Sequence, residues 1–406
     1  MERKKNIGIF IDAFYPMIDG VVSVVDNYAR LLSKYANVTV FTIKGRSDYD
    51  DSRFPYKVVR CKSIDVFKLD YNLGVPIFDL KFKKAVRKSH LDIVHIHSPF
   101  SIGKTGLKYA RTHKIPVVAS LHSQFKRDFE RATKNKTIVK WLVRRVTRVY
   151  DKCNEAWAVN SEVAKVFDGY GLKAKTIVMN NATEMQPLET VDESILAKYG
   201  INPNERNFLF VGRINVVKNI YFIVDVMERL KATYGSSFKM YFVGSGQDEV
   251  KLKKYIADKD MEDCVKMLGA INDRNELANI YKACHLFVFP SLYDCSSIVQ
   301  IESASQRTPA IFMQGAVTAE NVADGINGYL GENDVEKFAE KIASIFADEE
   351  QYNKVCDNCF KTLYVNWDTK IQEVYGKYLE KIDENNAKLY AKKHKKEVVD
   401  EEYGKA

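Results

Sequence analysis

The stretch "ACHLFVFPSLYDCSSIVQIESASQ" (residues 283–306) joins an apolar run to a segment that holds two carboxylates. The run ends at Pro290 and has the composition of a buried strand. Asp294 follows it, and Glu302 comes eight positions later, in a helix that the serines after Asp294 would begin. Because eight residues make a little over two helical turns, Glu302 can still point toward the same side as Asp294. Ligands of open α/β sheets bind where strands end, so this stretch predicts a ligand site.

The rest of the chain repeats the pattern of a short strand followed by a helix. Runs that are apolar on both faces, such as "NIGIFID" and "DIVHIH", suit parallel strands covered on both sides by helices. A second series of such runs begins near residue 206. The sequence therefore predicts an α/β protein with two doubly wound, Rossmann-like domains that face each other across a cleft. We expect an N-terminal domain at residues 1–185, a C-terminal domain at residues 186–383 whose last helix, from about residue 367, returns to the first domain, and a charged tail at residues 384–406.

Composition limits the class of protein. The 406 residues carry a net charge of +9, and the excess of basic residues lies in the first 185. A basic first domain could face an anionic membrane, a nucleic acid or an acidic substrate. The seven cysteines are odd in number and irregularly spaced, unlike a disulfide framework. No apolar run has the length of a membrane span, and Asp12 interrupts the first apolar stretch, which reads as a strand and not as a signal peptide. We therefore expect a cytoplasmic protein.

A pair of cations stands at the start of the second domain. In "FVGRINVVKN", Arg213 comes directly after a strand and Lys218 precedes a helix. Taken alone, the two residues would suit a solvated surface, but their place at a strand end favours a ligand. Two fixed cations there suit a diphosphate, since arginine can bind two of its oxygens at once.

Arg213, Lys218, Asp294 and Glu302, in this order on a second α/β domain, resemble the site of the retaining glycosyltransferases of family 4, which have the GT-B architecture. The most specific match is the E-x7-E motif, here Asp294-x7-Glu302. The G-R-x4-K pattern that ends at Lys218 supports it. The motifs of the N-terminal half are matched by "PMIDG" (16–20), "HIHSP" (95–99), "SLHSQF" (120–125) and "VNSEVAKVF" (159–167).

The resemblance implies a role for each residue of the donor site. Arg213 and Lys218 would hold the donor diphosphate, Glu302 would bind the ribose, and the backbone near Ile271 would contact the base. Gly20 would let the first loop approach the diphosphate closely, because glycine has no Cβ. The transferred sugar and its reacting carbon would be contacted by Asp294, by the amides of Ser296, Ser297 and Ile298, and by His122.

Two departures from the family pattern concern the sugar and the first loop. Asp294 is one methylene shorter than the family's glutamate, and C-S-S replaces the usual G-F-G, which leaves the donor sugar open. Asp19 stands where the family has a glycine, and it would repel a diphosphate, so we expect it to point at the acceptor or at solvent. His95 and His97 alternate on one strand, so only one of them can face the cleft, and we assign His97 to the acceptor side.

The reaction implied by the resemblance needs no metal. Breaking a sugar–phosphate bond releases a nucleoside diphosphate, and two cations beside a helix N-terminus would stabilise the growing charge. A D-x-D pair occurs at Asp48 and Asp50 and could hold a metal diphosphate, but its polar surroundings indicate a solvated turn. We predict no metal and no other cofactor, with the nucleotide-sugar as a substrate.

The basic segment at residues 126–152 has two interpretations. Its second half sets apolar residues at helical spacing beside Trp141. A basic amphipathic helix of this kind can lie on an anionic membrane, each cation adding about 1 kcal/mol near the surface. The alternative is a helix packed on the first domain with a solvated charged face. The membrane interpretation assigns the contact to Lys140, Trp141, Arg144, Arg145 and Arg148.

The leading hypothesis is an enzyme that moves a hexose, with retention, from a UDP-linked or similar donor to an acceptor. The expected acceptor is a membrane glycolipid such as a diacylglycerol, or a lipid-linked glycan, which would place the enzyme peripherally on the inner face of the membrane. The same fold with a soluble acceptor or an epimerase activity stays open. From other classes, a basic nucleic-acid-binding protein and a sugar-binding module without catalysis remain, although the basic stretch is helical and lacks the interleaved aromatics of a nucleic-acid surface. We expect no nucleic-acid partner, and no feature of the sequence specifies an oligomeric state.

Overall fold

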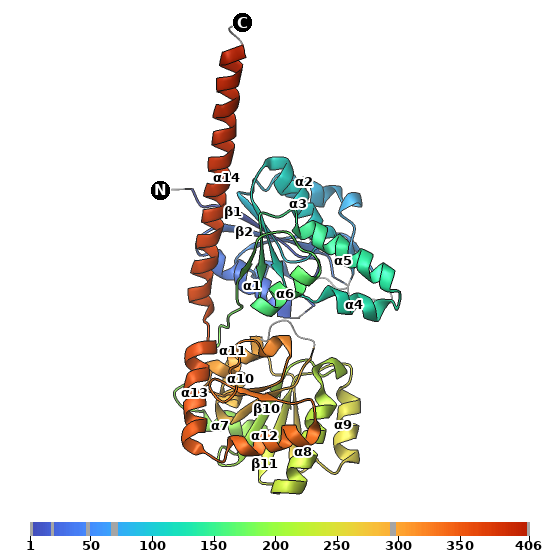
Figure 1. Ribbon diagram of the computed structural model, residues 1–406, viewed down its shortest axis with the longest axis vertical. Coiled ribbons are helices and arrows are strands. Elements are labelled where there is room, and N and C mark those ends of the chain that lie inside the picture. The colour runs from blue at the N-terminus through green and yellow to red at the C-terminus, as the bar shows by residue number, and fades with distance from the viewer. Residues whose placement is uncertain (1–2, 18–19, 46–48, 66–71, 293–297, 404–406) are drawn as a thin grey trace. The chain divides into compact units, whose positions relative to one another are not determined.

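Two α/β units make up the chain, and each has its own parallel sheet (Figure 1). A computed structural model describes residues 3–17, 20–45, 49–65, 72–292 and 298–403, with side chains as far as residue 394. The first unit is Met1–Asn180 together with Trp367–Ala406, and the second is Asn181–Asn366.

Seven parallel strands in the order β3-β2-β1-β6-β7-β8-β9 form the main sheet of the first unit. The order reverses between β1 and β6, as in doubly wound folds, so the loops after these two strands meet at a switch point. The strands are β1 (Asn6–Phe10), β2 (Asn37–Ile43), β3 (Lys57–Cys61), β6 (Ile93–Ile96), β7 (Val117–Leu121), β8 (Glu155–Ala158) and β9 (Thr176–Val178), with a short antiparallel pair, β4 (Ser63–Ile64) and β5 (Leu73–Gly74).

The helices of the first unit are amphipathic and bury one face. In α5 the valines face the core, whereas Lys140, Arg144 and Arg148 are exposed. The side chain of Asn135 begins this helix by accepting a hydrogen bond from the Thr137 amide at 3.0 Å. The elements are α1 (Gly20–Leu32), η1 (Asp51–Arg53), η2 (Pro76–Phe78), α2 (Leu80–Arg87), α3 (Ser101–His113), α4 (Phe125–Ala132), α5 (Lys136–Tyr150) and α6 (Ser161–Gly169).

The last helix, α14 (Trp367–Tyr403), belongs to the first unit. The ring of Trp367 packs edge-on against Tyr28 of α1, with centroids 5.3 Å apart. The Tyr378 hydroxyl lies 2.6 Å from Nδ1 of the buried His95 on β6. Trp367 and Tyr378 are both fully buried, so this apolar stripe fixes the helix to the unit.

The limits of the two units can be compared with those expected from the sequence. The boundary between the units falls at Asn180, close to the expected residue 185, and the helix from Trp367 lies in the first unit, to which it was expected to return. The charged tail from residue 384, for which a solvated helix and a disordered segment were both open, continues α14 as far as Tyr403. Buried side chains from Trp367 to Ile382 hold the helix to the unit, whereas residues 386–394 are exposed.

The second unit has six parallel strands in the order β12-β11-β10-β13-β14-β15. This order again reverses once, between β10 and β13. The strands are β10 (Arg206–Val211), β11 (Phe238–Val243), β12 (Val265–Gly269), β13 (Leu286–Phe289), β14 (Ala310–Met313) and β15 (Tyr329–Gly331). The helical segments are α7 (Glu193–Tyr199), η3 (Val216–Lys218), α8 (Ile220–Tyr234), α9 (Glu249–Asp258), α10 (Arg274–Ala283), α11 (Ile298–Ser305), η4 (Val317–Ala319), α12 (Val335–Ile345) and α13 (Glu349–Leu363).

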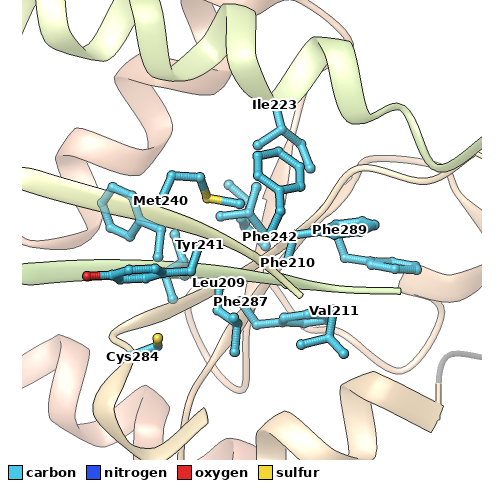
Figure 2. Packing of buried hydrophobic residues seen from close by; sticks show 14 of the residues in the cluster. Leu209, Phe210, Val211, Ile223, Met240, Tyr241, Phe242, Cys284, Phe287 and Phe289 are labelled. Atoms are coloured by element: carbon cyan, nitrogen blue, oxygen red, sulfur yellow. The ribbon is translucent and has the colours of Figure 1, made fainter. Parts of the chain in front are cut away.

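The core of the second unit lies on both faces of its central strands. Figure 2 shows Phe210 of β10 between Phe242 of β11 and Phe289 of β13. The Phe210 and Phe289 rings stack with centroids 5.8 Å apart, and all three side chains are buried. Burial on both faces explains why these strands are uninterrupted apolar runs in the sequence.

Candidate active site

The switch point of the second unit brings together two segments that carry the predicted site. β10 pairs with β13 through Phe208 opposite Leu286 and Leu209 opposite Phe287. The loop after β10 contains Arg213 and Lys218, and the loop after β13 leads into α11. The carboxyl ends of two adjacent parallel strands lie at the same edge of the sheet, so both loops meet there.

A second loop holds the loop after β10 in place. The Ile214 amide donates to the Ser245 carbonyl at 3.0 Å, so the backbone after β10 runs beside the backbone after β11. A Cβ at Gly246 would lie 2.2 Å from the Ile214 carbonyl oxygen, so only glycine allows this approach. The buried carboxylate of Asp248 accepts a hydrogen bond from the Val216 amide at 2.9 Å.

Lys218 ends the short helix η3 and is tied to the end of β13. Its amide donates to the Asn215 side chain at 3.3 Å, and its ammonium lies 5.4 Å from the ring centroid of Phe289. The Asn219 side-chain amide donates to the Pro290 carbonyl at 3.4 Å. Arg213 is exposed, and within the described part of the chain its guanidinium has no hydrogen-bond or ion-pair partner. Lys218 is thus fixed near β13, and Arg213 is open to solvent. Both cations suit an anionic ligand.

Glu302 lies in α11 and is almost completely buried. Its carboxylate accepts a hydrogen bond from Arg274 Nη2 at 2.5 Å, and the Tyr281 hydroxyl lies 3.4 Å from its other oxygen. Burial, together with the neighbouring Glu302 carboxylate, raises the pKa of Tyr281 well above its ordinary value, so Tyr281 stays a neutral donor. Nothing in the pattern of the sequence pointed to Arg274.

The remaining donor residues of the second unit are only partly described. Ile271 lies in the loop after β12, half-buried against the core, and Asp273 begins α10 just beyond it. Ile298 is the first residue of α11 and is half-buried. Asp294, Ser296 and Ser297 lie outside the described residues, and their predicted contacts with the sugar stay predictions.

Two predicted residues of the first unit lie side by side. His97 follows β6 and His122 follows β7, and His97 Nδ1 is 2.9 Å from His122 Nε2. Burial lowers the pKa of His122 to about 4 and the pKa of His97 well below its usual value. Both rings are therefore neutral at pH 7. The Nε2 atom of His97 is buried with no hydrogen-bond partner among the described atoms.

His95 does not share this position. Its two ring nitrogens lie 2.6 Å from the Tyr378 hydroxyl and 2.8 Å from Ser120 Oγ, so it is a satisfied core histidine. Gly20 is the first residue of α1, and apart from its chain neighbours and its own helix backbone no described atom lies within 4 Å of where its Cβ would be. Asp19 lies outside the described residues.

The basic helix α5 has an exposed outer face. Trp141 is 52% exposed, and the Arg145 guanidinium lies over its ring, 4.6 Å from the centroid. Lys140, Arg144 and Arg148 are exposed beside it. A further group of apolar side chains on the same unit is exposed, although it was not among the predicted residues: Leu73, Ile77, Phe78 and Leu80, which are 46–78% exposed. Among the described helices, none combines the length and the apolar composition of a membrane span.

Comparisons with known proteins agree on one family. The family model "Glycosyltransferase Family 4" matches residues 18–186, and "Glycosyl transferases group 1" matches residues 191–362. The alpha-monoglucosyldiacylglycerol synthase of Acholeplasma laidlawii is 26% identical over 95% of this chain and 100% of its own length. A synthase of the same name from Streptococcus pneumoniae is 26% identical over 81% of this chain and 76% of its own.

Solved structures show the same fold. A glycosyltransferase from Rickettsia africae covers 94% of this chain and 99% of its own, with a TM-score of 0.72 and 16% identity. The Anabaena protein HepE, solved in complex with UDP, covers 93% of this chain and 100% of its own, with a TM-score of 0.74 and 15% identity. The fold and the matched models thus define a GT-B glycosyltransferase that uses a nucleotide-sugar donor, which confirms the predicted fold class and enzyme class. The chain belongs to the retaining glycosyltransferases of family 4.

Proposed function

We propose that the enzyme transfers a hexose from a UDP-linked sugar to a membrane lipid such as diacylglycerol. The names of the two synthases support a lipid acceptor, and the HepE complexes with UDP and UDP-glucose support a uridine donor. The two cations of the second unit suit the diphosphate of such a donor.

The observation that carries the donor site is the convergence of cations at the switch point. The loop with Arg213 and Lys218 is fixed by Asp248 and by the end of β13, so the backbone that carries the two cations is positioned before a ligand arrives. Preorganised cations aimed at a leaving diphosphate lower the barrier to its release. In this proposal Arg213 and Lys218 bind the diphosphate, Glu302 binds the ribose and the loop at Ile271 contacts the base.

The chemistry then requires no metal cofactor. The nucleoside diphosphate leaves with growing negative charge, and the two cations offset it in place of a divalent ion. Asp294 and the amides of Ser296, Ser297 and Ile298 are proposed to hold the transferred sugar. His122, neutral at pH 7, is proposed to lie near the reacting carbon, with Gly20 beside the diphosphate and Asp19 and His97 on the acceptor side.

The first unit is proposed to contact an anionic membrane. The exposed face of α5 carries Lys140, Trp141, Arg144, Arg145 and Arg148, which combines an aromatic anchor with cations. A second contact is the apolar edge, defined as Leu73, Ile77, Phe78 and Leu80. Lys81, Lys83 and Lys84 are exposed directly after it, so apolar side chains and cations again occur together. Peripheral binding at the inner leaflet, which carries anionic lipids, follows.

A transfer assay tests the donor and the acceptor together. The purified enzyme is incubated with UDP-glucose or other nucleotide-sugars, and with diacylglycerol in anionic vesicles or with soluble sugars. We expect a glycolipid product with the anomeric configuration of the donor. Lys218→Met should lower kcat/KM by about 100-fold or more, because a charge-stabilising group is lost. Lys253→Met, which removes an exposed lysine of α9, should leave kcat/KM unchanged.

Other outcomes would contradict the proposal. Products formed only with soluble acceptors would favour an enzyme of the same fold that uses a soluble acceptor. Release of an epimerised sugar without any acceptor would favour an epimerase. Equal activity of the wild type and Lys218→Met would remove the donor site from the second unit.

A further inference from the structure

Glu302 and Arg274 form an ion pair that differs strongly in exposure. The side chain of Glu302 is 6% exposed and that of Arg274 is 51% exposed, and Nη2 of the arginine lies 2.5 Å from Oε1 of the glutamate. A buried carboxylate without a partner is strongly destabilising, so Arg274 offsets the charge of Glu302. The arginine therefore acts from the solvent side on a carboxylate that is itself inside the unit.

The hydrogen bonds of Glu302 leave room for a ligand. A carboxylate has about four acceptor positions, two on each oxygen. Arg274 uses one on Oε1, and the Tyr281 hydroxyl, at 3.4 Å, uses one on Oε2. Each oxygen keeps a position that is not used by these two residues. Two adjacent acceptors match two adjacent hydroxyls, as on the ribose of a nucleotide.

Arg274 also lies next to the segment proposed to contact the base. It is the first residue of α10, and Asp273, the residue before it, begins the helix by accepting from the Asn275 and Glu276 amides. Ile271 is three positions earlier. The backbone that carries Arg274 is therefore fixed by its own helix cap, and the arginine joins the end of the base loop to α11.

We propose that Arg274 is a positioning residue that orients Glu302 toward the ribose hydroxyls and so makes the site select ribonucleotides. The inference rests on the proposed role of Glu302 and extends it to Arg274. Neither the family pattern nor the comparisons give Arg274 a role. Arg274 acts through Glu302 and does not touch the reacting atoms.

A pair of nucleotides tests this role. Calorimetry measures the binding of UDP and of 2′,3′-dideoxy-UDP to the full chain. The wild type should prefer UDP by about 10- to 100-fold, since hydrogen bonds to a charged group are lost with the analogue. Arg274→Met should reduce this preference to about threefold or less, and Arg274→Lys, which keeps the charge, should restore part of it. Arg229→Met, which removes an exposed ion pair between Arg229 of α8 and Glu336 of α12, should keep the wild-type ratio.

The outcomes separate this inference from the proposed function. An unchanged preference in a folded Arg274→Met variant, or tighter binding of UDP by it, would overturn the positioning role alone. Lys218→Met should weaken both nucleotides equally and keep their ratio. A wild type that binds UDP without any preference would overturn the ribose role of Glu302 and this inference together, and one that does not bind UDP at all would also overturn the proposed donor.

Discussion

His97 Nδ1 and His122 Nε2 lie 2.9 Å apart, at the carboxyl ends of two adjacent strands in the first unit. Each ring is buried enough to lower its pKa, so the pair is neutral and one ring donates to the other. The ring of His95 lies 4.0 Å from that of His97, and burial lowers its pKa as well. The first unit thus holds three neutral histidines close together.

This group makes stability depend on pH. In the unfolded chain the histidines bind protons below about pH 6.5, whereas folded His122 does so only near pH 4. Between these values the unfolded state binds more protons, so the free energy of unfolding falls as pH falls. Each buried histidine should contribute up to about 1.4 kcal/mol per pH unit. Urea denaturation at pH 7, 6 and 5 measures the slope.

A double variant tests whether His97 and His122 cause this dependence of the free energy of unfolding on pH. His97→Gln together with His122→Gln should make it shallower, and the remainder should come from His95 and from His285, whose pKa values burial also lowers. A wild-type stability that does not change between pH 7 and pH 5 would contradict the assigned burial of the histidines.

Asp248 should influence donor binding without touching the donor. Asp248→Ala leaves the Val216 amide without its partner, which should cost about 1–3 kcal/mol of stability and loosen the loop that carries Lys218. We expect a raised KM for the nucleotide-sugar and a smaller change in kcat. Asp263→Ala removes a half-exposed aspartate paired with Lys231 and serves as the control. A variant with normal KM would show that the loop does not need this support.

Gly246 should not tolerate a side chain. A Cβ there would meet the Ile214 carbonyl oxygen at 2.2 Å, so Gly246→Ala must separate the two loops and should cost about 1–3 kcal/mol. Gly376→Ala in α14 has open space around it and should be neutral or stabilising by up to about 1 kcal/mol. Thermal unfolding of both variants makes the comparison. Similar melting temperatures would mean that the loops can separate freely.

The apolar edge should control membrane binding. Phe78→Ser with Leu80→Ser removes two side chains that are 78% and 77% exposed, so the fold should not change while binding to anionic vesicles falls. Vesicle flotation with anionic and zwitterionic lipids measures this, and Trp141→Ala tests α5 in the same way. Val250→Ser changes an equally exposed apolar residue of the second unit and is the control. If the double variant still floats with the vesicles, the apolar edge is not the contact.

Several features of the fold and the site followed from local sequence alone. An apolar run followed by Arg213, and later Lys218, is enough to place two cations at a strand end, because strand and loop are set by neighbouring residues. The same holds for the exposed basic face of α5, whose helical spacing separates its valines from its arginines. The boundary at Asn180 was less accessible, since it depends on the contacts of the folded chain.

Only the tertiary structure decided which partners the residues of the site contact. Arg274 and Glu302 are 28 positions apart, Asp248 and Val216 are 32 apart, and His97 and His122 are 25 apart. Two of these pairs meet because neighbouring parallel strands end at one edge of a sheet, whereas Arg274 and Glu302 meet because α10 packs against α11. The exposure of Phe78 was equally hidden, because a sequence shows that a side chain is apolar but not whether another element covers it.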